Sequence, residues 1–85
     1  MSIVVDPDYA RDAGTLWGEY LGTLREGDLH VVLFRQRDRV EAYVSADEQT
    51  PEEAVEPYLP EIKDFVAHQE PPLPLRLIMT GSRPW

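Results

Sequence analysis

Apolar residues recur along this chain with two different spacings, which predict a succession of strands and helices. Residues 3–5 predict a short first strand, after which Asp6 provides a helix cap and Pro7 the first helical residue. Apolar residues at three- and four-residue spacing predict that this helix covers residues 7–26, with Gly27 as its left-handed stop. The apolar stripe consists of Ala13, Leu16, Trp17, Tyr20, Leu21 and Leu24.

The next two apolar runs predict a β-hairpin. Residues 29–36 are apolar on both faces, as in a central strand, whereas residues 39–46 alternate between apolar and polar positions. The short connection through Arg37 and Asp38 joins the two strands. The second strand directs Val40, Ala42 and Val44 toward the core.

A second helix is predicted to begin at Pro51. Thr50 and Glu53 have the spacing of a capping box, in which each side chain accepts a hydrogen bond from a backbone amide of the other residue. Two prolines inside the following apolar stripe remove backbone donors, which predicts a break near Glu56. The stripe consists of Val55, Tyr58, Leu59, Ile62, Phe65 and Val66.

Residues 73–79 alternate again and predict a last strand. The order is then β-α-β-β-α-β, which is typical of the ferredoxin-like α+β plan. We therefore expect a four-stranded antiparallel sheet with two helices on one face. Residues 1–79 would form a single domain, and residues 80–85 a polar C-terminal tail.

Charge is concentrated in one part of the chain. The net charge is −8, and residues 47–70, which we call the acidic segment, contribute −7 of it. Along a helix, this segment would carry one net charge per about 5 Å, compared with about 3.4 Å along a single nucleic-acid strand and about 1.7 Å along a duplex. It could therefore imitate a single strand crudely and a duplex poorly. We predict that the acids of this segment bind a basic surface of a protein partner; the alternative is a solvated helix face that keeps the chain soluble. The predicted binding residues are Asp47, Glu48, Glu52, Glu53, Glu56, Glu61 and Asp64.

Composition excludes several other classes of function. The acidity disfavours direct binding to nucleic acid or to an anionic membrane. The chain has no cysteine, which excludes thiolate chemistry, and its two histidines offer little basis for a metal site. We therefore expect no cofactor and no metal. No catalytic motif occurs, and the N-terminus carries no signal peptide, so we expect a non-enzymatic protein of the cytoplasm.

Two smaller groups of residues predict secondary contacts. Arg35, Arg37 and Arg39 have alternate spacing that would place all three on one side of the hairpin, to hold an acidic group or to pair with neighbouring carboxylates. Glycines at four-residue steps would form a smooth ridge on the first helix, either for internal packing or for a homodimer or partner contact. These glycines are Gly14, Gly18 and Gly22.

Three other readings of the sequence stay open. A ferredoxin-like dimer could bind a small molecule between sheet and helices, with His30 or Tyr43 as its polar group. The run 39–46 matches an RNA-recognition signature at four positions, although Val40 replaces its glycine. His68 follows Asp64 by one helical turn, as in a surface ion pair or an oriented base.

The combined interpretation is a small acidic inhibitor that binds a protein and performs no catalysis. Its acidic segment would dock on the basic, nucleic-acid-binding surface of a bacterial target. Small acidic proteins encoded by phages, including anti-CRISPR and DNA-mimic inhibitors, are similar to this chain in size and charge, a similarity that no motif carries.

Overall fold

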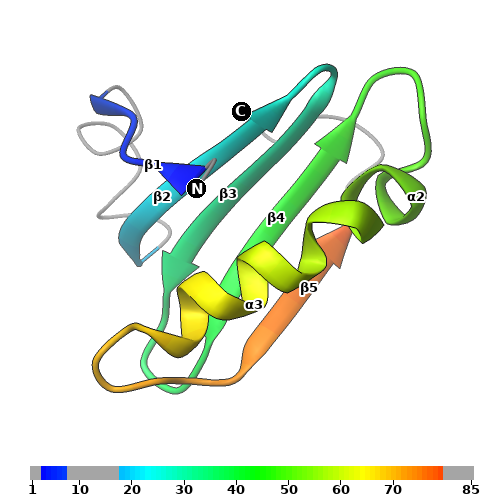
Figure 1. The fold of residues 1–85 in the computed structure, drawn as a ribbon. Helices are drawn as coiled ribbons and strands as arrows, with labels where there is room; N and C mark the ends of the chain where they lie inside the picture. Colours follow the sequence, from blue (N-terminus) through cyan, green and yellow to red (C-terminus); the bar gives the residue numbers. More distant parts are fainter. Residues whose placement is uncertain (1–2, 8–17, 80–85) are drawn as a thin grey trace.

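The computed structural model describes residues 3–7 and 18–79, which form a mixed sheet with one helical layer on it (Figure 1). Neighbouring strands follow the chain order β1-β2-β3-β4-β5, antiparallel up to β4 and parallel between β4 and β5. The strands are β1 (Ile3–Val4), β2 (Glu19–Glu26), β3 (Leu29–Arg35), β4 (Val40–Ala46) and β5 (Leu75–Met79). The helices are α2 (Pro51–Val55), the 3-10 helix η1 (Glu56–Tyr58) and α3 (Leu59–Ala67).

The predicted ferredoxin-like plan is wrong. The described residues hold five strands rather than four, the sheet is mixed, and a single helical segment of residues 51–67 replaces the two helices. This segment crosses one face of the sheet and returns the chain to β5 beside β4 (Figure 1). A parallel pair requires such a crossover connection, which explains why β5 can run in the same direction as its neighbour β4.

The predicted helix over 7–26 is wrong because its last eight residues form a strand. Residues 19–26 form β2, which pairs with β3 across a two-residue connection of Gly27 and Asp28. Gly27 has a φ of 61°, and glycine at the first position of such a connection is typical of a tight hairpin turn. The same glycine therefore ends a strand where the sequence predicts the end of a helix. The stretch 8–17 of that prediction, with Gly14, lies outside the described residues.

The prediction of a glycine ridge on a helix is consequently wrong for Gly18 and Gly22, the two of its three glycines that the structure describes. Gly18 precedes β2 with a φ of 98°, and a Cβ atom there would lie 2.6 Å from the Arg35 carbonyl oxygen. Gly22 lies within β2, where a Cβ atom would come within 2.9 Å of the Ile3 side chain. Both glycines serve internal packing, since each admits a neighbouring strand at close range.

The predicted hairpin of 29–36 and 39–46 and the predicted second helix are confirmed in their main features. β3 and β4 pair through the Arg37–Asp38 turn, and α2 begins at Pro51. The predicted break near Glu56 is the change from α2 to η1, which contains Pro57. The capping box does not form, because the Thr50 side chain makes no cap hydrogen bond.

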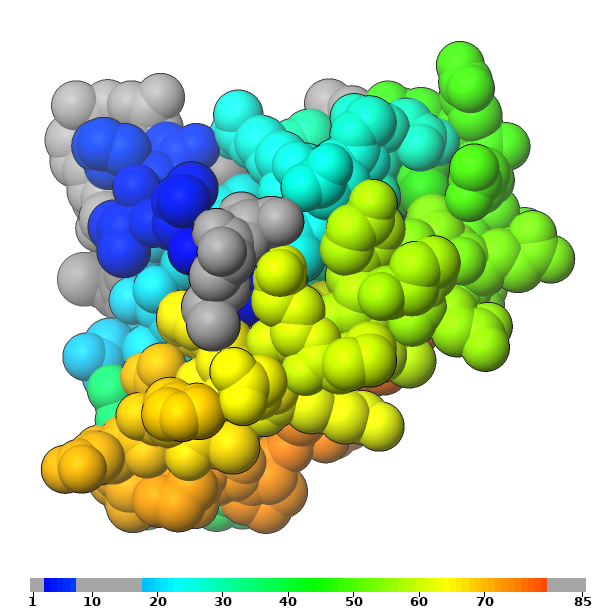
Figure 2. All heavy atoms as spheres, viewed as in Figure 1, coloured from blue at the N-terminus to red at the C-terminus, as the bar shows by residue number. Residues whose placement is uncertain are grey.

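The hydrophobic core lies between the helical segment and one face of the sheet, which we call the helix face. Figure 2, viewed from the same side as Figure 1, shows the side chains of the helical segment in front of the strands. The predicted strand positions Val40, Ala42 and Val44 and the predicted helix positions Val55, Ile62 and Val66 meet in this core. Burial of these apolar side chains fixes which side of the helical segment remains for solvent.

Candidate functional site

The acidic segment runs along the side of the helical layer that faces away from the sheet. Asp47 and Glu48 lie in the loop after β4, Glu52 and Glu53 on α2, and Glu56 at the start of η1, and all five are exposed. Asp64 on α3 is exposed as well. The apolar stripe is buried against the sheet, so the residues between its members point to solvent. The exposure that the acid positions predict is therefore present at six of the seven predicted binding residues.

Glu61 is the exception among these acids. Its side chain is half-buried at the start of α3, and its Oε2 atom is buried without a hydrogen-bond partner. Spacing along a helix could not reveal this, because the depth of each position depends on what the helix packs against. Glu61 is accordingly less available to a partner than the other six acids.

Salt bridges distribute the positive charge away from the acidic segment. Three arginines form salt bridges with acids that lie outside the acidic segment. The pairs are Arg25 with Asp6, Arg35 with Glu19, and Arg39 with Asp38 and Glu41. Within the part of the chain that the structure describes, no salt bridge reaches Glu48, Glu52, Glu53, Glu56 or Glu61. Apart from the half-buried Glu61, these side chains therefore carry uncompensated negative charge at the surface.

His68 is the basic group that pairs within the segment. Its Nδ1 atom lies 2.7 Å from the Asp64 carbonyl oxygen and 3.6 Å from the Asp64 carboxylate. Both side chains are mostly exposed, which makes this a surface contact of the kind that contributes little to stability. The arrangement matches the predicted surface ion pair.

Asp28 anchors the beginning of the acidic segment to the sheet. Its Oδ2 atom accepts a hydrogen bond from the Glu48 backbone N–H at 2.7 Å and a longer one from Gln49 at 3.4 Å. These backbone donors stabilise the ionised carboxylate and hold the pKa of Asp28 below its usual value of 3.8. Local sequence patterns do not indicate this contact, since Asp28 and Glu48 lie twenty residues apart in the chain.

The hairpin arginines do not lie on one side, contrary to the prediction. Arg35 is directly opposite Val40 and shares the helix face with it, while Arg39 binds Glu41 on the other face of the sheet. Residues opposite each other across a hairpin share a face, so the register and not the alternate spacing decides where each arginine points. Arg35 also donates a hydrogen bond to the Glu70 carbonyl oxygen at 3.0 Å. Arg37 is exposed in the turn.

The face of the sheet away from the helices, which we call the second face, holds a buried polar cluster. Glu41 is only 7% exposed, and it accepts hydrogen bonds from Arg39 Nε at 3.1 Å and from the Tyr43 hydroxyl at 3.2 Å. Burial raises the pKa of Tyr43 above its usual 10.0, and the negative charge of Glu41 raises it further. Glu41 was predicted only to point away from the core, because the alternation along β4 does not show how deeply that face is covered.

A row of aromatic rings crosses the same face. The ring centroids of Tyr20 and Phe34 lie 5.8 Å apart, as do those of Phe34 and Tyr43. Phe34 is only 3% exposed, so it is not a platform on which a base could stack. Tyr43 packs across strands, and the ferredoxin-like plan on which the RNA-binding reading rested is absent.

The pocket expected between sheet and helices does not include its predicted polar groups. His30 alternates with the core residues Leu29 and Val31, so its side chain lies on the second face. Tyr43 lies on that face too, directly opposite Val32. Neither side chain can reach a ligand between the sheet and the helical segment.

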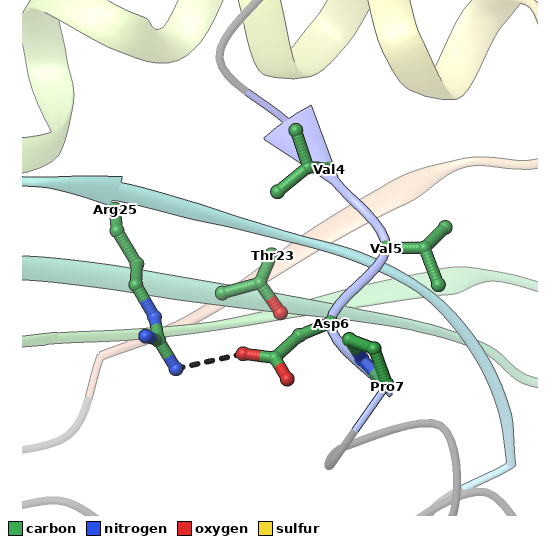
Figure 3. A pocket seen from close by; sticks show the side chains of 6 residues that line it. All are labelled: Val4, Val5, Asp6, Pro7, Thr23 and Arg25. Atoms are coloured by element: carbon green, nitrogen blue, oxygen red, sulfur yellow. Dashed lines mark hydrogen bonds and ion pairs between the residues drawn. The ribbon is translucent and has the colours of Figure 1, made fainter.

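Described residues line two surface hollows of similar size, each of about 320 Å³. The first, the edge hollow, lies beside β1 and is bridged by the ion pair of Arg25 Nη2 and Asp6 Oδ2 at 2.8 Å (Figure 3). Figure 3 shows Val5 pointing to the opposite side of the chain from this pair. Val4 and Val5 are 62% and 65% exposed, which makes this the apolar edge of the sheet.

The second, the turn hollow, lies at the end of the sheet where the β2–β3 turn approaches α2 (Figure 1). Three of its lining residues are acidic, namely Glu26, Asp28 and Glu53. None of its lining residues is basic. It therefore joins the anchored start of the acidic segment to the turn that precedes β3.

Residues 3–7 and 18–79 contain no group of three or more His, Asp or Glu side chains placed to hold a metal ion. No helix within these ranges has the length and apolar character needed to cross a bilayer.

Comparisons with protein-family models, with curated proteins and with solved structures give no match.

Proposed function

We propose that this chain is a small, non-catalytic protein-binding module that inhibits a bacterial target by docking its acidic segment on a basic, nucleic-acid-binding surface. One observation supports this most strongly. Three arginines, Arg25, Arg35 and Arg39, are bound to acids outside the segment, while four exposed glutamates of the segment have no salt bridge among the described residues. Such a surface offers its charge to an external partner.

The placement of these carboxylates favours electrostatic docking. Three of these exposed glutamates lie on a helical layer whose other side is fixed by the core, and Glu48 lies in the loop that precedes it, so they present their charges together and with little rearrangement. A field of one sign raises the rate at which an oppositely charged partner approaches and disfavours partners of like charge. The segment would therefore select a basic surface and reject nucleic acid itself.

The density of charge indicates what kind of basic surface fits. Five acids and Lys63 give the helical segment 51–67 a net charge of −4. This is about one charge per 6 Å of helix, sparser than the one per 3.4 Å of a single nucleic-acid strand. The segment would occupy a basic groove by neutralising some of its cations, and it would not reproduce the phosphate spacing. Arg37, which is exposed in the turn between β3 and β4, would be a secondary contact.

We further propose that this encounter takes place in a bacterial cytoplasm, where nucleic-acid-binding proteins are found. The test is capture on the immobilised chain from a bacterial lysate at low salt, followed by identification of the bound proteins. We expect nucleic-acid-binding proteins that are released by added DNA or RNA and by higher salt. Captured proteins that resist both treatments would contradict the proposal, and a surface without capture would indicate that the acids serve solubility alone.

A further inference from the structure

The turn hollow combines charge with an apolar lining in a way that identifies one kind of occupant. Its acidic members come from three places: Glu26 from the end of β2, Asp28 from the turn and Glu53 from α2. Asp28 is engaged with the backbone of Glu48. Glu26 and Glu53 form no salt bridge with any described residue, so both carboxylates are available to a ligand.

The rest of the lining consists of apolar residues together with the polar side chain of Gln49. Leu29 and Ala54 are buried core residues that reach the hollow, and Pro57 and Tyr58 border it from η1. A basic side chain needs this combination, because its methylene stem packs against apolar groups while its charged end stays near carboxylates. Tyr58 adds an aromatic ring, which attracts a cation placed over its face.

Size disfavours a metabolite in this hollow, and charge disfavours an anion. At about 320 Å³ the hollow is at the lower limit of small-molecule sites, which suits a single side chain better than a metabolite. The three carboxylates repel an anionic group such as a phosphate. Arginine fits better than lysine, because its planar guanidinium can bind a carboxylate through two parallel hydrogen bonds and also stack on an aromatic ring.

We propose that the turn hollow receives an arginine side chain of the protein partner, held by Glu26 and Glu53 at its rim and by Tyr58 at its wall. This rests on the proposed function, since it names one contact of the same docking surface. It adds a position at which the partner must project a single arginine beyond the rest of its basic surface.

Two neighbouring acids provide a matched test. Glu52 and Glu53 lie side by side in α2 and both are exposed, but Glu53 lines the hollow and Glu52 does not. The full chain is titrated with N-acetyl-arginine amide, and binding is followed by amide chemical shifts in NMR. We expect saturable shifts centred on Gly27 and Ala54, about fivefold weaker binding in Glu53→Gln, and binding unchanged in Glu52→Gln.

Several outcomes would overturn the assignment. These are equal effects of the two substitutions, shifts that spread along the whole segment, or no saturation at tens of millimolar ligand. An equal response to N-acetyl-lysine amide would overturn the choice of arginine. Amide spectra of both variants away from α2 report whether they keep the wild-type fold.

Failure here is distinguishable from failure of the proposed function. Partner capture that depends on the acidic segment, without binding of the arginine amide, would leave the function and remove this contact. Specific binding of the amide without any capture of a basic partner would leave the contact and remove the function.

Discussion

The Asp28 carboxylate accepts the backbone N–H of Glu48 at 2.7 Å and thereby joins the β2–β3 turn to the start of the acidic segment. This one contact fixes where the segment leaves the sheet. It also lies beside the turn hollow, which Asp28 lines. The position of the acidic surface thus depends on a turn that the sequence predicts as the end of a helix.

Acid should weaken the protein in part through this contact. The pKa of Asp28 is lowered in the folded state by backbone hydrogen bonds, chiefly from Glu48. Its contribution to stability is complete above the pKa of the unfolded chain and is lost as the pH falls through the lower folded pKa. We expect the free energy of unfolding to decline below about pH 5, with a shallower decline in Asp28→Ala than in the wild type.

Urea unfolding at a series of acidic pH values measures this difference. Glu52→Ala is the control, because Glu52 is an exposed acid with no hydrogen bond among the described residues. Its profile should keep the wild-type slope. If Asp28→Ala and the wild type lose stability in parallel as the pH falls, the contact does not act as described.

Alkaline conditions should weaken the protein through the second face. Burial, and then the charge of Glu41, raise the pKa of Tyr43 in the folded state above its usual 10.0. A raised folded pKa gives stability that is complete below the unfolded pKa and is lost as the pH rises through the folded value. The free energy of unfolding should therefore fall above about pH 10, and Tyr43→Phe should make that fall shallower. Unfolding curves at several alkaline pH values give both slopes, and identical slopes would refute the assignment.

The close approach at Gly18 predicts a large loss of stability on substitution. Gly18→Ala combines a φ of 98° with a Cβ atom only 2.6 Å from the Arg35 carbonyl oxygen. We expect it to lower the free energy of unfolding by about 2–3 kcal/mol, from backbone strain and overpacking together.

Gly27→Ala is the matched control for this substitution. Gly27 also has a positive φ, of 61°, but no atom lies within 4 Å of an added Cβ. Its cost should be about 1 kcal/mol, the backbone term alone. Urea unfolding of the two variants compares them directly, and equal losses would mean that the contact with Arg35 is unimportant.

The strands and the helical segment of the second half could be predicted from the sequence because local patterns decide them, whereas the parallel pairing of β5 with β4 could not. The alternation in β4 and the stripe of the helical segment each match one period, and Pro57 marks the break between α2 and η1. The first half could not, because Gly27 suits a helix end and a hairpin turn equally. The pair Gly27–Asp28 between apolar runs was the signal for a hairpin.

The candidate site was predictable to a similar extent. Exposure of the acids follows from the apolar stripe, which the sequence shows. The sides taken by Arg35 and Arg39 depend on strand register, and the burial of Glu41 and Glu61 depends on packing between distant elements. Neither register nor depth is visible in local spacing.

We expect position within the acidic segment, and not total charge, to determine partner binding. Glu56→Lys and Asp38→Lys change the net charge equally, but Glu56 begins η1 in the segment and Asp38 lies in the β3–β4 turn. The measurement is the dissociation constant of each variant for a captured basic partner at low salt. We expect about tenfold weaker binding in Glu56→Lys and a near wild-type value in Asp38→Lys. Equal weakening in both, or none in Glu56→Lys, would contradict docking through the acidic segment.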